Sequence, residues 1–279
     1  IYEQKILSWK PDLIFMYNFN SISSKLLRKI RDEYKIPTAY WVFADPLIGD
    51  KLSAYYFDHL IDCSHLFFIN GSAMPSLQLF SKAKFHFLPV AADHNLYKPL
   101  HLKKDIDLIM IGNFSNISTS TITKAYILDK LCEAGFQVSA AGAGLKELVV
   151  NIHFPNLKKL QVIKDKFLSV EEINELYNRA KIVLAPEHPR DKDSPSPRVF
   201  EAALSGTLPL ADFQRDSEKL IKEMDIIFQS VDQLIKKICF YLKNEPERER
   251  LAQKIHQSAL IEHTVQERAK TILLKVFLP

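Results

Sequence analysis

The sequence predicts an α/β protein with two parallel sheets, each covered by helices. Three observations favour this class. Short apolar runs rich in β-branched and aromatic residues alternate with amphipathic helical stretches, which is typical of βαβ units and a parallel sheet. The alternation stops at one polar segment and then restarts. The chain of 279 residues also exceeds the length that a single core usually serves, so two domains are expected.

The first third of the chain contains four predicted strands and one clear amphipathic helix. The helix covers Ser23–Tyr34, where leucine and isoleucine residues recur at helical spacing. Asp45-Pro46 and Asn70-Gly71 follow two of the strands and end them, because both pairs favour turns. The predicted strands are Asp12–Tyr17, Thr38–Ala44, His65–Asn70 and Phe85–Val90.

A polar segment, Ala91–Lys104, breaks this alternation and carries Pro99. Segments of this composition are typical of connections between domains. We therefore place a first domain at residues 1–101 and a second domain at residues 102–279. The last helix of the second domain is free to cross back to the first.

The second domain repeats the alternation of strands and helices. A helix from Ser118 to Gly135 starts with Ser and Thr residues, and Ser169-Val-Glu-Glu172 forms a capping box for another. Two or three helices from residue 231 to residue 278 close the chain. The predicted strands are Asp107–Asn113, Phe136–Gly144 with its glycine-containing loop, Lys181–Ala185, Thr207–Asp212 and Asp225–Ser230.

The stretch Glu187–Leu210 gathers most of the candidate chemistry. A polar loop leads into a helix for which Ser196 is the predicted N-cap and Pro197 the first residue, and a glycine ends it. Arg198 and Glu201 share one face of that helix. Open parallel sheets bind ligands beyond the carboxyl ends of their strands, and helix N-termini favour phosphate. The stretch therefore predicts an anion-binding site.

The same stretch carries a family resemblance. The run S-P-S-P-R-V-F-E-A-A-L-S-G resembles the signature of group 1 glycosyltransferases of the GT-B fold, and its Ser-x-x-Arg-x-Phe-Glu pattern is similar to the CgeB-like (spore-maturation-protein-like) branch. The wider group has two acidic residues eight positions apart. Here Asp193 stands eight positions before Glu201, where the group usually has Glu.

The resemblance extends in order over nearly the whole chain, in blocks such as KPDLIFMYN, TAYWVFADP and ELYNRAKIVLAPE. It implies the GT-B architecture of two Rossmann-like domains with parallel sheets. A complete GT-B first domain opens with a strand and a Gly-rich loop, and nothing before Tyr17 supplies them. The first domain is therefore expected to be truncated or abbreviated.

The resemblance also implies an activity and a set of residues. The protein would be a glycosyltransferase that moves a sugar from a nucleotide-diphospho-sugar, such as a UDP-, GDP- or dTDP-sugar, to a protein, a glycan or a lipid-linked sugar. The chemistry implied is retaining and of the hexosyl type, with no metal and no further cofactor. Arg198 would neutralise the diphosphate, Glu201 would bind the ribose hydroxyls and Asp45 would face the cleft as the third catalytic residue. The implied donor-binding residues are Gly112, Asn113, Glu187, His188, Arg190, Asp193, Ser194, Ser196, Arg198 and Glu201.

Each assignment has an alternative. Arg198 and Glu201 are also spaced as a surface ion pair of little energetic consequence. His188 is equally a solvated loop residue, and Asp45 a turn residue before proline. The scaffold would also serve a nucleotide-sugar epimerase or hydrolase, or a catalytically idle protein with an assembly or binding role.

Two D-x-D pairs resemble the metal motif of the other large glycosyltransferase fold. Asp105 and Asp107 precede a strand, whereas ligand sites lie beyond carboxyl ends. Asp191 and Asp193 lie in the candidate loop, where Lys192 competes for their charge. A metal site is therefore not expected from either pair.

Composition narrows the classes of function and location that remain. The net charge is +4, and the sequence contains no dense Lys/Arg tract of the kind that binds nucleic acid. No apolar run has the length of a membrane span, which leaves peripheral membrane contact open. Three scattered cysteines form no disulfide framework and favour a reducing, cytoplasmic location. The acceptor and the oligomeric state have no signature in the sequence.

Overall fold

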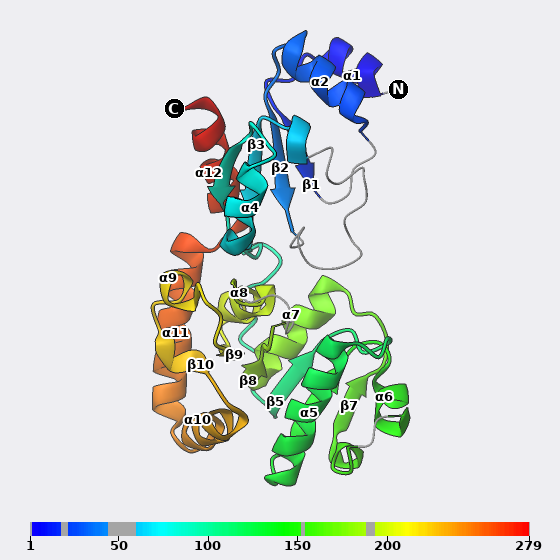
Figure 1. The fold of residues 1–279 in the computed structure, drawn as a ribbon. Coiled ribbons are helices and arrows are strands. Elements are labelled where there is room, and N and C mark those ends of the chain that lie inside the picture. The colour runs from blue at the N-terminus through cyan, green and yellow to red at the C-terminus, as the bar shows by residue number, and fades with distance from the viewer. Residues whose placement is uncertain (1, 18–21, 44–59, 152–153, 188–192, 279) are drawn as a thin grey trace. The chain divides into compact units, whose positions relative to one another are not determined.

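The computed structural model describes residues 2–17, 22–43, 60–151, 154–187 and 193–278 (Figure 1). The chain forms two compact units. Unit 1 comprises Ile1–Pro89 and Arg268–Pro279, and unit 2 comprises Val90–Glu267. The division falls between residues 89 and 90, whereas the sequence interpretation placed it after residue 101.

Unit 1 is built on a four-stranded parallel sheet with the strand order β1-β2-β3-β4. The buried core includes Leu27 of α2, Leu66 and Phe68 of β3, and Leu77 of α4. Ser23 caps α2, because its side chain accepts a hydrogen bond from the Leu26 N–H. The elements are α1 (Tyr2–Trp9), β1 (Ile14–Tyr17), α2 (Ser24–Asp32), β2 (Thr38–Val42), β3 (His65–Phe68), η1 (Gly71–Ala73), α4 (Met74–Gln78) and β4 (Lys84–Phe87).

Unit 2 is built on a six-stranded parallel sheet with the strand order β10-β9-β8-β5-β6-β7. From β5 the chain winds outward through β6 to β7, then returns beside β5 as β8 and winds the other way. The direction therefore reverses between β5 and β8, and such switch points open a crevice at the carboxyl ends of the strands. The strands are β5 (Ile106–Ile111), β6 (Val138–Ala141), β7 (Gln161–Lys164), β8 (Ala180–Leu184), β9 (Leu208–Asp212) and β10 (Ile227–Phe228).

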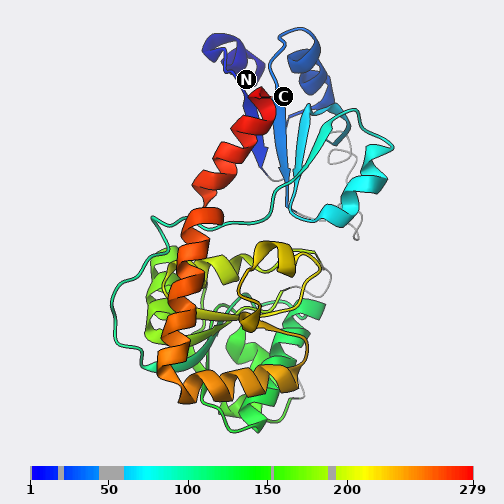
Figure 2. The same cartoon turned by 90° about the vertical axis from the view of Figure 1, so that its left-hand side faces the viewer.

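The helices of unit 2 begin where the sequence chemistry favours them. Ser118 caps α5, and the capping box predicted at Ser169 and Glu172 is confirmed at the start of α7. Helix α11 packs on α8 and β9, and Figure 2 shows it in orange running along this unit. The helices are α5 (Thr119–Glu133), α6 (Leu145–Asn151), η2 (Leu157–Lys159), α7 (Val170–Arg179), α8 (Pro197–Leu204), α9 (Ser217–Leu220), η3 (Met224–Ile226), α10 (Val231–Lys243), α11 (Glu245–Glu262) and α12 (Val265–Phe277).

Two glycine turns pack directly against each other at the carboxyl ends of β5 and β6. Gly142 has φ +137°, and a Cβ at this position would lie 1.7 Å from the Gly112 carbonyl oxygen. Only glycine fits this backbone conformation and this approach. A Cβ on Gly144 would likewise lie 2.4 Å from Ser115 Cα. The glycines of the loop after β6 therefore allow close packing of the two turns.

Residues 91–104, which the sequence interpretation treated as the connection, are bonded within unit 2. Ala92 bridges to Thr264. Further along, the side chain of Asn178 accepts a hydrogen bond from Leu100 N at 2.6 Å and donates one to the Lys98 carbonyl at 3.0 Å. Two buried asparagines of α7, Asn174 and Asn178, thus hold this segment against the helix.

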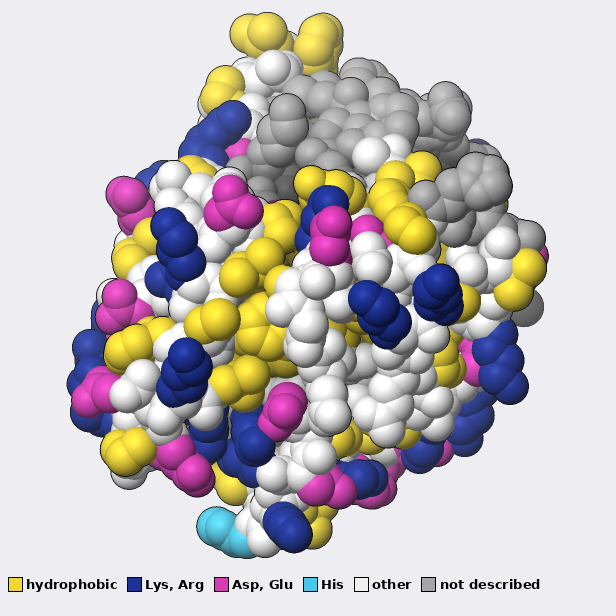
Figure 3. Space-filling model, turned by 90° about the horizontal axis from the view of Figure 1, so that it is seen from below, with side chains coloured by type: hydrophobic (Ala, Val, Ile, Leu, Met, Phe, Trp, Pro, Cys, Tyr) yellow, Lys and Arg dark blue, Asp and Glu magenta, His cyan; other side chains and the backbone are white. Residues whose placement is uncertain are grey.

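The last helix contributes to both units. Residues of α12 from Arg268 onward belong to unit 1, where the Arg268 Nε donates to the Pro89 carbonyl at 2.8 Å. On the face in Figure 3, Lys and Arg side chains are mixed with Asp and Glu side chains around an apolar centre, which fits the small net charge of +4. None of the described helices has both the length and the apolarity that a membrane span needs.

The predicted α/β class with two parallel sheets is therefore confirmed. The predicted strands correspond to observed strands, and their ends differ by a few residues because the apolar runs continue into the turns that follow. The largest difference is in the run after residue 136, where the strand proper covers only Val138–Ala141.

Candidate functional site

A pocket of about 290 Å³ lies in unit 2 at the switch point of the sheet. Its walls come from the turns after β5, β6 and β7, from α7, from the start of α8, and from the segment at residue 97. All of these elements meet at the carboxyl edge of the sheet, where parallel α/β folds bind ligands. The lining residues are Tyr97, Ile111, Gly112, Asn113, Gly142, Ala143, Lys166, Phe167, Leu168, Ile173, Tyr177, Pro197, Arg198 and Glu201.

Helix α8 aims its N-terminus at this pocket. Pro197 occupies the first turn, as predicted, and the chain leaves the helix through Gly206 at φ +76°. Its inner face, which includes Phe200, is buried, and burying one such side chain stabilises the fold by about 1.5–3 kcal/mol. Ser196 is at the N-cap position, but its side chain makes no cap hydrogen bond. Its buried Oγ has no hydrogen-bond partner among the described residues.

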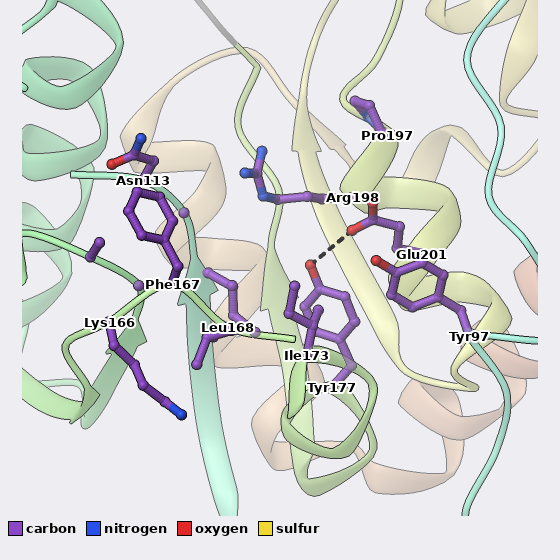
Figure 4. Close-up of a pocket in the computed structure, with 14 residues that line it drawn as sticks. Tyr97, Asn113, Lys166, Phe167, Leu168, Ile173, Tyr177, Pro197, Arg198 and Glu201 are labelled. Carbon is purple, nitrogen blue, oxygen red and sulfur yellow. Dashed lines mark hydrogen bonds between the residues drawn. The ribbon is translucent and has the colours of Figure 1, made fainter. Parts of the chain in front are cut away.

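Arg198 extends its guanidinium into the pocket (Figure 4). Within the described part of the chain, this side chain makes no hydrogen bond and no ion pair, including none with Glu201. The alternative of an Arg198–Glu201 surface ion pair is therefore not what the structure contains. An unpaired guanidinium facing a pocket offers up to five donors to an anionic ligand.

Lys124 of α5 brings a second cation to the same place. A Cβ on Gly112 would lie 3.6 Å from the Lys124 Nζ, so the amine lies beside the turn after β5. Burial, and after it the charge of Arg198, lowers the pKa of Lys124 to about 8, while Glu187 acts in the opposite direction. Among the described residues Lys124 has no ion-pair partner. Two cations that form no ion pair with the described residues thus lie at the same turn, and an anion there would relieve their repulsion.

Glu201 is one helical turn further along α8 and is bonded to tyrosines. The Tyr177 hydroxyl donates to the Glu201 Oε2 at 3.3 Å, and the Tyr97 hydroxyl faces the same carboxyl group (Figure 4). Burial raises the pKa of Glu201, whereas Arg198, Tyr177 and Tyr97 act to lower it. The carboxylate is thus placed as a hydrogen-bond acceptor at the pocket wall.

The far side of the pocket is formed by two turns. The Asn113 side chain accepts a hydrogen bond from Ser115 N at 2.9 Å, which fixes the turn after β5. Phe167 follows β7 and is 74% exposed, so its ring is free to contact a ligand. Lys166 points away from Arg198 (Figure 4) and pairs with Glu172 at 2.8 Å. This side therefore offers an aromatic ring and backbone groups.

The structure brings together only part of the predicted site. Gly112, Asn113, Arg198 and Glu201 line the pocket, while Asp45, His188 and Arg190 lie outside the described residues. The other predicted binding residues, Glu187, Asp193, Ser194 and Ser196, do not line the pocket.

Two of those residues have other bonds. The Asp193 carboxylate is 2% exposed and lies 3.2 Å from Arg215 Nη1. The Glu187 N–H donates to Asp212 Oδ1 at 2.8 Å. These contacts join the loop before α8 to the turn after β9, so they position the helix and leave the pocket to other side chains.

Sequence reasoning missed Lys124, Tyr97, Tyr177 and Phe167. Lys124 lies in the middle of a helix, outside any motif. Tyr177 is fully buried on its helix, and its hydroxyl reaches Glu201. The one usable signal in the sequence was the position of Lys124 around its predicted helix, compared with the predicted turn at Gly112.

Both aspartates of the first D-x-D pair form ion pairs, one with an arginine and one with a lysine. Asp105 binds Arg179 at 2.9 Å, and Asp107 binds Lys181 at 2.6 Å. Both aspartates lie at the amino end of β5 in the six-stranded sheet, whereas the pocket lies at the carboxyl end. They therefore act as ion-pair partners there.

The two units, each built on a parallel sheet and the second with a cationic pocket at its switch point, define an α/β protein of the GT-B class. A family model described as "Glycosyl transferase-like" matches residues 124–274, more than half of the chain. The chain belongs to this glycosyl transferase-like family. The matched region includes α8 and the whole of α7.

Solved structures support the same fold. Sucrose-phosphate synthase from Thermosynechococcus elongatus has a TM-score of 0.67 and 12% identity, covering 97% of this chain and 74% of that one. Anabaena HepE in complex with UDP has a TM-score of 0.69 and 14% identity, covering 98% and 80%. The pneumococcal O-GlcNAc transferase GtfA, in complex with UDP and GlcNAc, has a TM-score of 0.62 and 14% identity, covering 100% and 60%.

Among curated proteins, none matches the sequence at a significant level. At 12–14% identity, the structural neighbours define the fold. The branch within the family and the chemistry of this chain depend on its own residues.

Proposed function

We propose that this protein is a retaining, metal-independent glycosyltransferase that binds a nucleoside-diphosphate sugar in the pocket of unit 2. The observation that carries the proposal is the meeting of Arg198, Lys124 and the N-terminus of α8 at one end of the pocket. Membership in the glycosyl transferase-like family and the UDP complexes of two structural neighbours support the choice of ligand.

The pocket has a separate place for each part of the donor. Its cationic end suits the diphosphate, because guanidinium, ammonium and helix N–H groups all stabilise phosphate oxygens. Glu201, an acceptor-only group when ionised, suits the ribose hydroxyls. Phe167 and the turn after β7 offer an apolar face and backbone groups to the base.

The chemistry follows from where charge develops. As the bond between the sugar and the diphosphate breaks, negative charge grows on the leaving phosphate oxygens. Arg198 and Lys124 stabilise that charge without reorganising, because Arg198 already faces the pocket and Lys124 lies beside the turn at Gly112 that lines it. The acceptor hydroxyl then bonds to the anomeric carbon on the face that the leaving group occupied, and its proton passes to the departing diphosphate.

The proposal is tested with nucleoside diphosphates and their sugars. We expect UDP, GDP or dTDP to raise the melting temperature, and the matching nucleotide sugar to be turned over with release of the diphosphate. Turnover that needs an acceptor supports a transferase, whereas turnover without one identifies a hydrolase or an epimerase. The absence of binding by every nucleotide would leave a catalytically idle scaffold.

Chelation of metals is expected to leave activity intact. The cations of this pocket are side chains, and the carboxylates Asp105 and Asp107 are paired with Arg179 and Lys181. Nucleotide-sugar turnover should therefore be equal with and without EDTA. Loss of turnover that Mn²⁺ or Mg²⁺ restores would contradict metal independence.

Because of Lys124, we expect the protein to take up a proton when it binds a nucleotide. With a pKa of about 8 in the free protein, part of the Lys124 population is neutral at pH 8, and the diphosphate favours the charged form. Affinity for UDP should fall as the pH rises from 7.5 to 9.5, by up to about tenfold per pH unit above the pKa of the free amine. Calorimetry at pH 8 in buffers of different ionisation enthalpy measures the uptake directly.

Lys124→Met removes that proton uptake and weakens UDP binding at pH 7.5. The matched control is Lys130→Met on the same helix, because Lys130 pairs with Glu133 on the exposed surface. Equal proton uptake by the wild type and Lys124→Met would exclude Lys124 from the anion site.

A further inference from the structure

Glu201 is enclosed by two tyrosines that come from different parts of unit 2. Tyr177 belongs to α7 and Tyr97 to the segment that precedes β5 (Figure 4). Both side chains are buried, with 0% and 9% exposed surface respectively. Their ring centroids are 6.4 Å apart, and both hydroxyls are turned toward the carboxyl group. We call Tyr97 and Tyr177 the tyrosine pair.

The tyrosine pair can only donate to this carboxylate. Burial raises the pKa of both Tyr97 and Tyr177, so the hydroxyls keep their protons. A carboxylate has about four lone-pair sites. The Tyr177 hydroxyl donates to one of them, and the Tyr97 hydroxyl faces the same group from the protein side. The remaining lone pairs of Glu201 then face the pocket, where a ligand hydroxyl can donate to them.

The position of Tyr97 is itself secured by α7 and α8. Asn174 Oδ1 accepts hydrogen bonds from Lys98 N at 3.1 Å and from Ser205 Oγ at 2.7 Å. Asn178 binds the next residues of the segment, as described above. The residue after Tyr97 is therefore bonded to α7, which carries Tyr177, and through Asn174 to the end of α8, which carries Glu201. The three side chains have a fixed mutual geometry.

We propose that Tyr97 and Tyr177 are positioning residues that orient the Glu201 carboxylate toward the ribose hydroxyls of the donor. This inference rests on the proposed function, and it explains how a partly buried carboxylate is held ready for a diol. The pair acts through Glu201 and has no part in the chemistry of the leaving group. Its loss should therefore change recognition of the ribose and leave recognition of the diphosphate unchanged.

The test compares each nucleoside diphosphate with its 2′,3′-dideoxy form. Calorimetric titrations use UDP, GDP and dTDP, their dideoxy counterparts and inorganic pyrophosphate. For the wild type, the best nucleotide should bind at least about tenfold tighter than its dideoxy form, because a charge-assisted hydrogen bond is lost. In Tyr177→Phe and Tyr97→Phe this ratio should fall below about threefold, with pyrophosphate affinity unchanged.

A pH profile gives a second readout that a purely structural role would not move. Among the described residues, the titratable and charged groups that face Glu201 are Arg198, Tyr97 and Tyr177. Removing a hydroxyl that donates to the ionised form raises the pKa of Glu201 further. Nucleotide binding needs the ionised carboxylate. As the pH is lowered, both phenylalanine variants should therefore lose binding at a higher pH than the wild type does.

The control variant is Tyr241→Phe, a buried tyrosine of α10 that does not line the pocket. It should retain the wild-type ratio and pH profile, and its melting temperature shows the cost of removing a buried hydroxyl. If the wild type and both phenylalanine variants discriminate against the dideoxy forms to the same extent, the positioning role is overturned. The proposed function would stand in that case. A wild type that binds no nucleoside diphosphate would overturn the proposed function and this inference with it.

Discussion

Replacing Arg198 with alanine is expected to lower turnover of the nucleotide sugar by about a hundredfold to a thousandfold, the effect of removing a preorganised group that stabilises charge in the transition state. The guanidinium faces the pocket and has no bonded partner in the described part of the chain. Donor binding should weaken less than turnover, because the charge on the leaving diphosphate is larger in the transition state than in the bound donor. Release of nucleoside diphosphate measures the rate, and calorimetry measures the affinity.

The fold of Arg198→Ala should be intact, since the side chain forms no hydrogen bond with any residue that the structure describes. The matched control is Arg250→Ala on α11, an exposed arginine that pairs with Glu247 at 2.8 Å. It should have wild-type turnover. Equal turnover in the wild type and Arg198→Ala would remove the cationic end of the pocket from the mechanism.

Replacing Glu201 with glutamine is expected to weaken nucleotide binding by about tenfold to a hundredfold, or about 1.5–3 kcal/mol, because a charge-assisted hydrogen bond is lost. Glutamine is a good helix former, and its amide oxygen still accepts from Tyr177. The melting temperature should therefore change little. Titration with the nucleotide that binds best to the wild type measures the effect.

Glu175→Gln on α7 is the control for this variant. Its side chain is half exposed and lies 3.8 Å from Arg179, so nucleotide affinity should stay at the wild-type value. Inorganic pyrophosphate should bind equally to Glu201→Gln and the wild type, because the carboxylate is assigned to the ribose. Unchanged nucleotide affinity in Glu201→Gln would exclude that assignment.

The fold was predictable because its signals are local. Alternating apolar runs and helical stripes identified the strands of both sheets, and a capping box identified the start of α7. The sequence interpretation joined residues 91–104 to neither sheet, since the polar composition of the segment favours a connection. In the structure its backbone is bonded to Asn174 and Asn178, a contact that only the folded chain brings together.

The site was predictable only where one short stretch contains it. Arg198 and Glu201 are three residues apart on one helix, so their shared face follows from helix geometry. Tyr97 and Tyr177 reach the same pocket from two other segments, and Lys124 of α5 lies beside its lining residue Gly112. Their convergence depends on the order of strands around the switch point, which local patterns do not specify.

Asp193 shows the opposite case. Its spacing from Glu201 matches the acidic pair of the wider family, and that match predicted a place at the donor. In the structure Asp193 is buried beside Arg215 and joins the loop before α8 to the turn after β9. Sequence spacing fixed its distance along the chain, but the loop geometry determined the direction of its side chain.

The most direct test of the account is a crystal structure of the protein with the nucleoside diphosphate that binds most tightly. We expect diphosphate density within hydrogen-bond distance of Arg198 and Lys124, at the N-terminus of α8, with the ribose hydroxyls on Glu201. Density for the nucleotide elsewhere, or a diphosphate out of reach of both cations, would contradict it.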